Sequence, residues 1–167
     1  MPLPHARFTL VLAFAAVLIV ACGGSTSPTT STPTPLTPAQ IQARYTAAAA
    51  HYNQGETQIA LTENASCDAA SATVALGACQ TALSAQRQLT IAYDNALRAI
   101  PFSGTAATAA GHLLGDDAAI EKLLEQAATA PAITVIATLQ EQVIPLLATA
   151  ATDATALRQA IGLPAPA

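Results

Sequence analysis

The sequence is poor in basic and aromatic residues, and both shortages limit what the protein can bind. Only 6 of its 167 residues are Lys or Arg, against 10 Asp and Glu, which gives a formal net charge of −4. Tryptophan is absent, and Phe and Tyr occur three times each. A nucleic-acid-binding surface needs a basic patch to neutralise phosphates and aromatic rings on which bases stack. We therefore expect no nucleic-acid partner.

Motifs that hold cofactors or perform catalysis are missing as well. No Glu is followed three residues later by His, as in ferritin-like di-iron bundles, and no Cys-x-x-Cys-His run could attach a haem. Met1 is the only methionine, which excludes a Met axial ligand in the processed chain. The sequence also lacks G-x-S-x-G, H-E-x-x-H and a phosphate-binding glycine loop. We expect a protein that has no cofactor and is not an enzyme.

The first 22 residues have the organisation of an export signal. A short segment with one arginine precedes residues 8–21, which are apolar apart from one threonine. This run is shorter than the roughly 20 residues of a transmembrane helix and has the length of a signal-peptide core. It ends in Ile19-Val20-Ala21-Cys22, which resembles the lipobox of bacterial lipoproteins. The resemblance implies a signal peptide over residues 1–21, cleavage before Cys22, and a lipid on the Cys22 sulfur.

That lipid would anchor the protein to a membrane in an extracytoplasmic location. The alternatives are an uncleaved signal anchor or an ordinary signal-peptide cleavage near Ala21. No long apolar run follows Ala21 in the sequence, so we expect the lipid on Cys22 to be the only membrane attachment.

Residues 22–37 form a predicted tether between the lipid and the folded domain. From Ser25 to Pro38 every residue is Ser, Thr or Pro except Leu36. Such a segment has almost no apolar surface to bury and stays extended, at roughly 3.1 Å per residue where proline favours polyproline II. It would hold the domain about 40 Å from the membrane.

The rest of the chain, residues 38–163, has the composition and periodicity of helices. Alanine is the commonest residue, and the helix-favouring Leu and Gln are frequent. Positions that we expect to be buried recur at alternating steps of three and four residues. These positions form four stripes, numbered in chain order, each of which would lie along one face of a helix. They predict helices over about 38–63, 78–100, 105–129 and 131–161. Thr37-Pro38, Thr129-Ala130-Pro131 and Gly162 supply the start and stop signals. Because the connections are short, we expect an all-α, up-down-up-down antiparallel four-helix bundle.

Two features complicate these helices. Pro145 lies inside the fourth stripe and should kink or split that helix near residues 141–144. Gly111 and Gly115 lie in the third stripe, each costing about 1 kcal/mol relative to Ala. Either two backbones approach closely there, or one helix ends near Leu114 and the next begins at Asp116. We expect one continuous helix.

Cys67 and Cys79 are an even pair in a chain that we expect to be exported, which favours a disulfide. On one straight helix, twelve residues span about 18 Å, whereas a disulfide needs Cα atoms roughly 4.4–6.8 Å apart. The bridge therefore requires a chain reversal between the two cysteines, and we place its last bend at Gly77. The alternative is a continuous helix with two free buried cysteines.

A loose set of polar residues is the only candidate site. His112 and Asp116 share a helix face, and Asp117 lies on the third stripe at the level of Gln86 and Thr90. We expect Gln86 and Thr90 to hydrogen-bond a buried Asp117 carboxylate in a layer that fixes helix register. The alternative is a small-molecule or metal site formed by His112, Asp116 and Asp117.

Taken together, these patterns indicate a lipid-anchored helical bundle that acts as a non-enzymatic binding or envelope-interaction module. Its expected partners are the membrane, through the lipid on Cys22, and either a cell-envelope protein or a small ligand. No residue pattern in the sequence selects between the last two.

Replacing Cys22 with Ser tests the anchor. The wild-type chain, expressed in a bacterium, should partition with membranes and carry a lipid at its mature N-terminus. The Cys22→Ser chain should accumulate as an unprocessed precursor, because the acceptor sulfur is missing. Mass spectrometry of the N-terminus decides the matter, and a wild-type protein released into the medium without modification would contradict the prediction.

Overall fold

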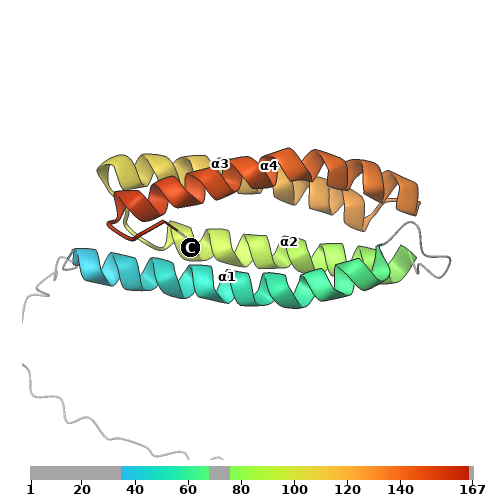
Figure 1. Cartoon of the computed structure of the whole chain (residues 1–167), viewed down its shortest axis with the longest axis horizontal. Coiled ribbons are helices and arrows are strands. Elements are labelled where there is room, and N and C mark those ends of the chain that lie inside the picture. The colour runs from blue at the N-terminus through green and yellow to red at the C-terminus, as the bar shows by residue number, and fades with distance from the viewer. Residues whose placement is uncertain (1–34, 68–75, 166–167) are drawn as a thin grey trace, which may run out of the picture. The chain divides into compact units, whose positions relative to one another are not determined.

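The computed structural model describes residues 35–67 and 76–165, and the regular secondary structure of this part of the chain is all helical, without strands. Its four helices are α1 (Pro38–Ser66), α2 (Leu76–Arg98), α3 (Gly104–Ala128) and α4 (Ile133–Ala160) (Figure 1). Each begins and ends within three residues of the expected range. The signal peptide, Cys22 and most of the tether lie outside the described residues.

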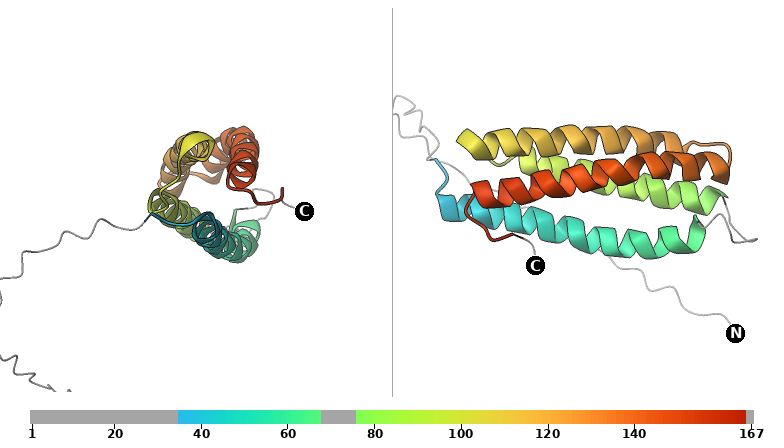
Figure 2. Two further views of the ribbon diagram at one scale, coloured as in Figure 1. Left: turned by 90° about the vertical axis from the view of Figure 1, so that its left-hand side faces the viewer. Right: turned by 45° about the horizontal axis from the view of Figure 1, so that its top comes forward.

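The four helices pack in chain order. α1 packs against α2, α2 against α3, and α3 against α4, whereas α1 and α4 are not among the packed pairs. Seen from the end, the helices occupy the corners of a square, and α1 and α4 form its least filled side (Figure 2). The expected up-down-up-down four-helix bundle is confirmed. Gly55 permits the approach of α1 to α2, because a Cβ atom there would lie 2.7 Å from Leu89 Cδ1.

The helix ends follow local sequence signals. Thr37 caps α1 by accepting from the Gln40 amide, while the Gln40 side chain accepts from the Thr37 amide, and Pro38 occupies the first turn. Gly162 adopts a φ of +80° after α4, and the Leu163 amide then donates to the Arg158 carbonyl. The expected start signal of the fourth helix at Thr129 is the exception. Thr129 lies at the C-terminal end of α3, and α4 begins after Ala132 without a side-chain cap.

The helices with unusual interior residues are both continuous. α3 runs through Gly111 and Gly115, and a Cβ atom at either position would meet nothing within 4 Å. Close backbone approach therefore does not explain these glycines. α4 continues past Pro145, so of the two expected effects of this residue, a kink or a split, the split does not occur. Because proline has no backbone N–H, the carbonyl one turn before Pro145 loses its hydrogen-bond donor. Pro145 is exposed, so water can reach that carbonyl.

Burial of the predicted stripes differs strongly between helices. All seven positions of the third stripe are buried: Ala106, Ala110, Leu113, Asp117, Ile120, Leu124 and Ala127. The second stripe is buried except for the half-buried Tyr93. In contrast, α1 buries only Tyr45, and α4 buries only Ile136, Ala150 and Leu157. The core is therefore centred on α2 and α3.

The disulfide between Cys67 and Cys79 is present, with the two Cα atoms 4.9 Å apart. It joins the end of α1 to the first turns of α2. Residues 68–75, which connect Cys67 to α2, lie outside the described part of the chain. Gly77 is already helical in α2, so the expected bend at this residue is wrong.

α4 also carries an unexpected amount of exposed apolar surface. Among the described residues, it is the one helix that is long and apolar enough to cross a membrane, with a mean hydropathy of 1.4 over an 18-residue window. Only 17% of that window is buried. Length and composition do not distinguish a membrane-spanning helix from one that packs in a bundle, and α4 packs against α3.

The disulfide should contribute to stability. Closing a loop of this length restricts the unfolded chain and stabilises the fold by about 3 kcal/mol. In urea unfolding, a reductant should lower the free energy of unfolding of the wild type by this amount. A Cys67→Ala/Cys79→Ala variant should have the lower stability under both conditions. Two free thiols in the intact mass of exported protein would contradict the bridge.

Candidate functional site

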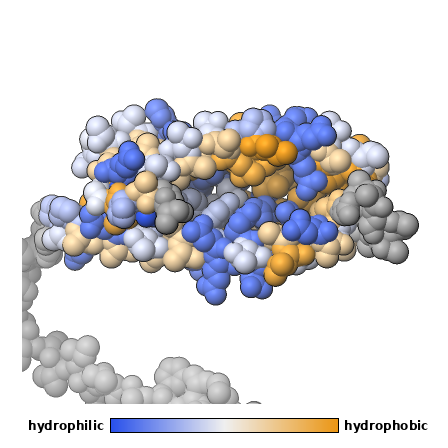
Figure 3. Space-filling model, in the orientation of Figure 1, coloured by the Kyte–Doolittle hydropathy of each residue, from blue (hydrophilic) through white to orange (hydrophobic). Residues whose placement is uncertain are grey.

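The least packed side of the bundle contains a groove between α1 and α4, with a volume of about 440 Å³. Its floor is formed by residues of α2 and α3. Figure 3 views this face: the surface is hollowed between α4 and α1, with hydrophobic residues gathered on α4 and hydrophilic ones along α1. The lining residues from α1, α2 and α3 are Tyr45, Ala49, Tyr52, Asn53, Glu56, Tyr93, Leu113 and Asp117. Those from α4 are Leu147, Ala150, Ala151, Ala154, Thr155 and Arg158.

Side chains of unequal size explain why the groove stays open. α4 presents mainly alanines to it, which leave space, while α1 presents tyrosines, Asn53 and Glu56. The Gln42 side chain closes one end by donating to the Ile161 carbonyl over 2.7 Å. Towards the disulfide, the same boundary between α1 and α4 holds a second, smaller hollow beside Glu63 and Gln140. The two hollows follow one incompletely packed seam.

Three tyrosines form the aromatic part of the groove. The rings of Tyr52 and Tyr93 have centroids 4.9 Å apart at an interplanar angle of 39°. Tyr45 is only 2% exposed and lies beside Tyr93. Burial, followed by the nearby Glu56 carboxylate, raises the pKa of Tyr52 to about 12. Burial likewise raises the pKa of Tyr93. Both rings therefore remain protonated and neutral at physiological pH.

A pair of buried carboxyl groups lies at the floor of the groove. Asp117 of α3 is 6% exposed and lines the groove, and its carboxyl group lies beside that of the fully buried Asp94 of α2. Burial, and then the Asp94 carboxyl, raise the pKa of Asp117 to about 8. Burial also raises the pKa of Asp94, although Asp117 and Arg98 act against it. Arg98 Nη2 donates to Asp94 Oδ2 over 2.9 Å.

The pair shares a proton at neutral pH. If both groups were ionised, Asp94 Oδ1 and Asp117 Oδ2 would be buried without a hydrogen-bond donor. Ionising both of two adjacent buried carboxyl groups costs free energy, because the two negative charges repel each other. One pKa of the pair therefore rises strongly, and the retained proton supplies a hydrogen-bond donor. At Asp94 the Arg98 guanidinium opposes this rise in pKa, because it favours the charged form of the carboxyl.

The expected partners of Asp117 are therefore wrong. Gln86 donates through Nε2 to Glu56 of α1, and the Thr90 hydroxyl donates to the Gln86 carbonyl over 3.2 Å. Residues 99–103 leave α2 through a turn, in which the Ile100 amide donates to the Leu97 carbonyl, and α3 begins beyond the end of α2 (Figure 1). Asp117 thus meets Asp94, one helical turn from Thr90. A signal was available, because Asp94 lies four residues after Thr90 and shares its buried face.

The other two candidate residues point elsewhere. His112 is exposed, and Asp116 faces Asp153 of α4 rather than Asp117. Partial burial, and then the Asp153 carboxyl, raise the pKa of Asp116. No group of three or more His, Cys, Asp and Glu within residues 35–67 and 76–165 could hold a metal ion. Of the predicted set, only Asp117 reaches the groove.

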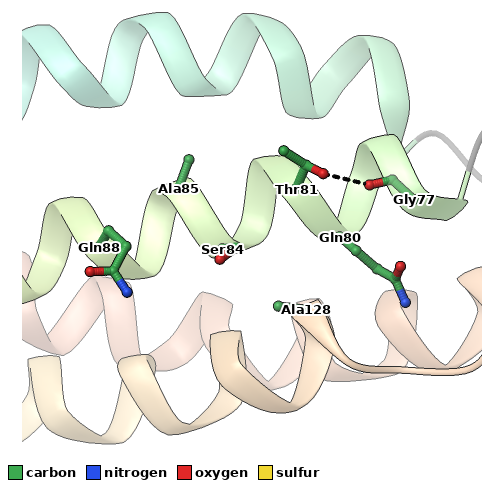
Figure 4. Close-up of a pocket in the computed structure, with 7 residues that line it drawn as sticks. All are labelled: Gly77, Gln80, Thr81, Ser84, Ala85, Gln88 and Ala128. Atoms are coloured by element: carbon green, nitrogen blue, oxygen red, sulfur yellow. Dashed lines mark hydrogen bonds between the residues drawn. The ribbon is translucent and has the colours of Figure 1, made fainter.

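Another hollow lies on the outer surface, where α2 passes the end of α3. Its side chains, which include Gln80, Ser84 and Gln88, spread outward from α2 and do not converge on a common point (Figure 4). The Thr81 hydroxyl donates to the Gly77 carbonyl over 2.8 Å and is thus engaged within its own helix. No buried or unpartnered group is found among these residues. The groove between α1 and α4 is the better candidate.

The carboxyl pair should make stability depend on pH. An unfolded Asp titrates near 3.9, so with a folded pKa of about 8 for Asp117 the folded chain holds the extra proton between these values. The free energy of unfolding should therefore fall as pH rises from about 4 to about 8, by at most about 1.4 kcal/mol per pH unit from this group.

Urea unfolding across this range measures the effect. Asp117→Asn should flatten the fall, because an amide does not titrate, and should be the more stable chain at pH 8. Glu125→Gln removes an exposed carboxylate paired only with Arg87 and should keep the wild-type slope. Equal slopes in the wild type and Asp117→Asn would refute the raised pKa.

Comparison of the chain with protein-family models, with curated proteins and with solved structures finds no match. Its function is therefore inferred from the chemistry of the groove. Three features carry the inference: the open space between α1 and α4, the tyrosine rings, and the carboxyl group of Asp117.

Proposed function

We propose that this chain is a lipid-anchored, extracytoplasmic protein that binds a small organic ligand in the groove between α1 and α4, without catalysing a reaction. The observation that carries the proposal is the groove itself. Its volume of about 440 Å³ lies within the roughly 300–1,000 Å³ typical of small-molecule sites. An apolar wall combined with a few convergent polar groups is also typical of such sites.

Two features support the extracytoplasmic location. Ile19-Val20-Ala21-Cys22 resembles a lipobox, and the residues that follow it have the composition of an extended tether. The disulfide between Cys67 and Cys79 suits an oxidising compartment, because cytosolic thiols are kept reduced. The lipid on Cys22 then restricts the groove to the neighbourhood of the membrane.

A metal-binding function for His112, Asp116 and Asp117 has less support, because Asp117 lies against Asp94 in the groove whereas Asp116 faces Asp153. Docking of a cell-envelope protein is the second candidate. It is favoured by Ile144 and Leu147 of α4, which are 65% and 44% exposed, with Leu147 lining the groove. A partner helix could cover these residues, whereas a small ligand would fill the floor beneath them.

Filling the groove distinguishes the two candidates. Ala151 is exposed and lines the groove, so Ala151→Phe should obstruct it with little cost to the fold. Ala156→Phe makes the same change about 140° further round α4 and serves as the matched control. The probes are 2-phenylethylamine, 2-phenylethanol and 3-phenylpropionate, each added to the full chain in detergent.

At least one probe should raise the melting temperature of the wild type and of Ala156→Phe, but not of Ala151→Phe. A ligand at tenfold excess over its Kd adds about 1.4 kcal/mol to the free energy of unfolding. The absence of any shift in the wild type, or equal shifts in both variants, would contradict binding in the groove.

A further inference from the structure

The charged groups of the groove are separated along its length. The bond between Gln42 and Ile161 sets α1 against α4, which places Arg158 level with Tyr45 and Leu147 level with Glu56. Eleven helical residues separate these two levels, a distance of about 16 Å. Arg158 also donates through Nε to the Pro164 carbonyl over 3.0 Å. The groove therefore has an acidic end, remote from its only lining cation.

Two of the three groove tyrosines lie near these acidic groups. Tyr52 and Tyr93, whose ring centroids lie 4.9 Å apart, line the groove together with Glu56 and Asp117. Tyrosine rings attract cations through their quadrupole, and this attraction is stronger where water is excluded. Glu56 is held in place because its Oε2 atom accepts from Gln86. Rings and carboxyl groups together form a site that favours positive charge.

Asp117 adds a group that lacks a donor. Its side chain is 6% exposed and it lines the groove, and once the proton shared with Asp94 is lost, its Oδ2 atom has no hydrogen-bond donor among the described residues. A buried acceptor in this condition is stabilised by any ligand that brings a donor, and most by a charged one. We propose that the groove selects an organic cation, an amine with an apolar body, whose ammonium group binds Asp117 beside Tyr52.

This inference rests on the proposed function, because it names the ligand class of the same groove. The apolar body of the amine would lie against Leu147, Ala151 and Ala154 of α4, where no charged group competes for it. The ammonium would replace the proton on the carboxyl pair, and that proton would leave to solvent. The bound state then holds one cation and two ionised carboxylates, with Arg98 neutralising the second.

Proton release makes the binding depend on pH. Because the pKa of Asp117 is about 8 in the unliganded chain, affinity should increase with pH up to about 8 and then level off. An alkylammonium, like that of Lys, keeps its charge over this range. The charged and titratable groups around Asp117 are Tyr52 and Glu56 (α1), Tyr93, Asp94 and Arg98 (α2), Asp116 and Glu121 (α3), and Arg158 (α4).

The test compares three probes of similar size and different charge on the full chain in detergent. Calorimetry at pH 8 should show that 2-phenylethylamine binds about tenfold or more tightly than the neutral 2-phenylethanol. The anionic 3-phenylpropionate should bind more weakly than both. For the amine alone, affinity should fall by up to about tenfold for each pH unit below 8.

Variants locate the ammonium. Asp117→Asn should remove most of the preference for the amine over the alcohol, together with its pH dependence, and Glu56→Gln should reduce that preference. Tyr52→Leu should weaken the amine more than the alcohol. Asp116→Asn removes the same charge one residue earlier, on a side chain that faces Asp153, and should keep the wild-type preference. Circular dichroism confirms that each variant is folded.

The possible failures are distinguishable. If the alcohol or the acid binds the wild type as tightly as the amine, and Ala151→Phe abolishes this binding, the groove binds a ligand but the cation preference is wrong. If Asp117→Asn and Asp116→Asn weaken the amine equally, the effect is general charge attraction and the proposed contact is overturned. If no probe binds, both the ligand class and the proposed function fail.

Discussion

The incomplete packing between α1 and α4 governs the properties of this bundle. α2 and α3, which each have two packed neighbours, bury seven residues apiece, whereas α1 buries one and α4 buries three. In a closed bundle every helix has two neighbours, and the interior is filled to the density of a crystal. Here alanines on α4 face tyrosines and Glu56 on α1, so the fourth interface leaves a groove in place of a core layer.

The groove gives the carboxyl pair its significance. Burying Asp94 and Asp117 together costs free energy, since desolvation opposes ionisation of both and their mutual repulsion adds to it. A pair enclosed by apolar side chains could relieve this cost only by holding a proton. Asp117 instead lines an open groove, where a ligand can reach it. The same arrangement that lowers the stability of the empty protein at alkaline pH thus provides a strong site for a positively charged group.

Periodicity in the sequence was sufficient to predict the four helices, their order and the buried face of α3, because α3 has a neighbour on each side. It could not show that the equivalent faces of α1 and α4 are half-exposed. A stripe indicates which way a helix faces, and only tertiary structure shows what lies opposite. The partner of Asp117 was missed for a related reason: the level of two antiparallel helices depends on the shape of their connection, and α3 begins beyond the end of α2 after the turn at residues 99–103. The disulfide was predictable because the chain has three cysteines, and with Cys22 assigned to the lipid the other two allow only one pairing.

The strongest connections of the bundle leave the groove free to admit a ligand. The disulfide joins α1 to α2, and the apolar contacts continue from α2 to α3 and from α3 to α4, so each restraint follows the order of the chain. Across the open seam, the Gln42 side chain makes one hydrogen bond to the Ile161 carbonyl at the end remote from the disulfide. A single bond of this kind contributes about 1 kcal/mol. Widening the groove therefore requires far less free energy than separating any packed pair, and a ligand that bridges α1 and α4 would complete the interface that the side chains leave unfinished.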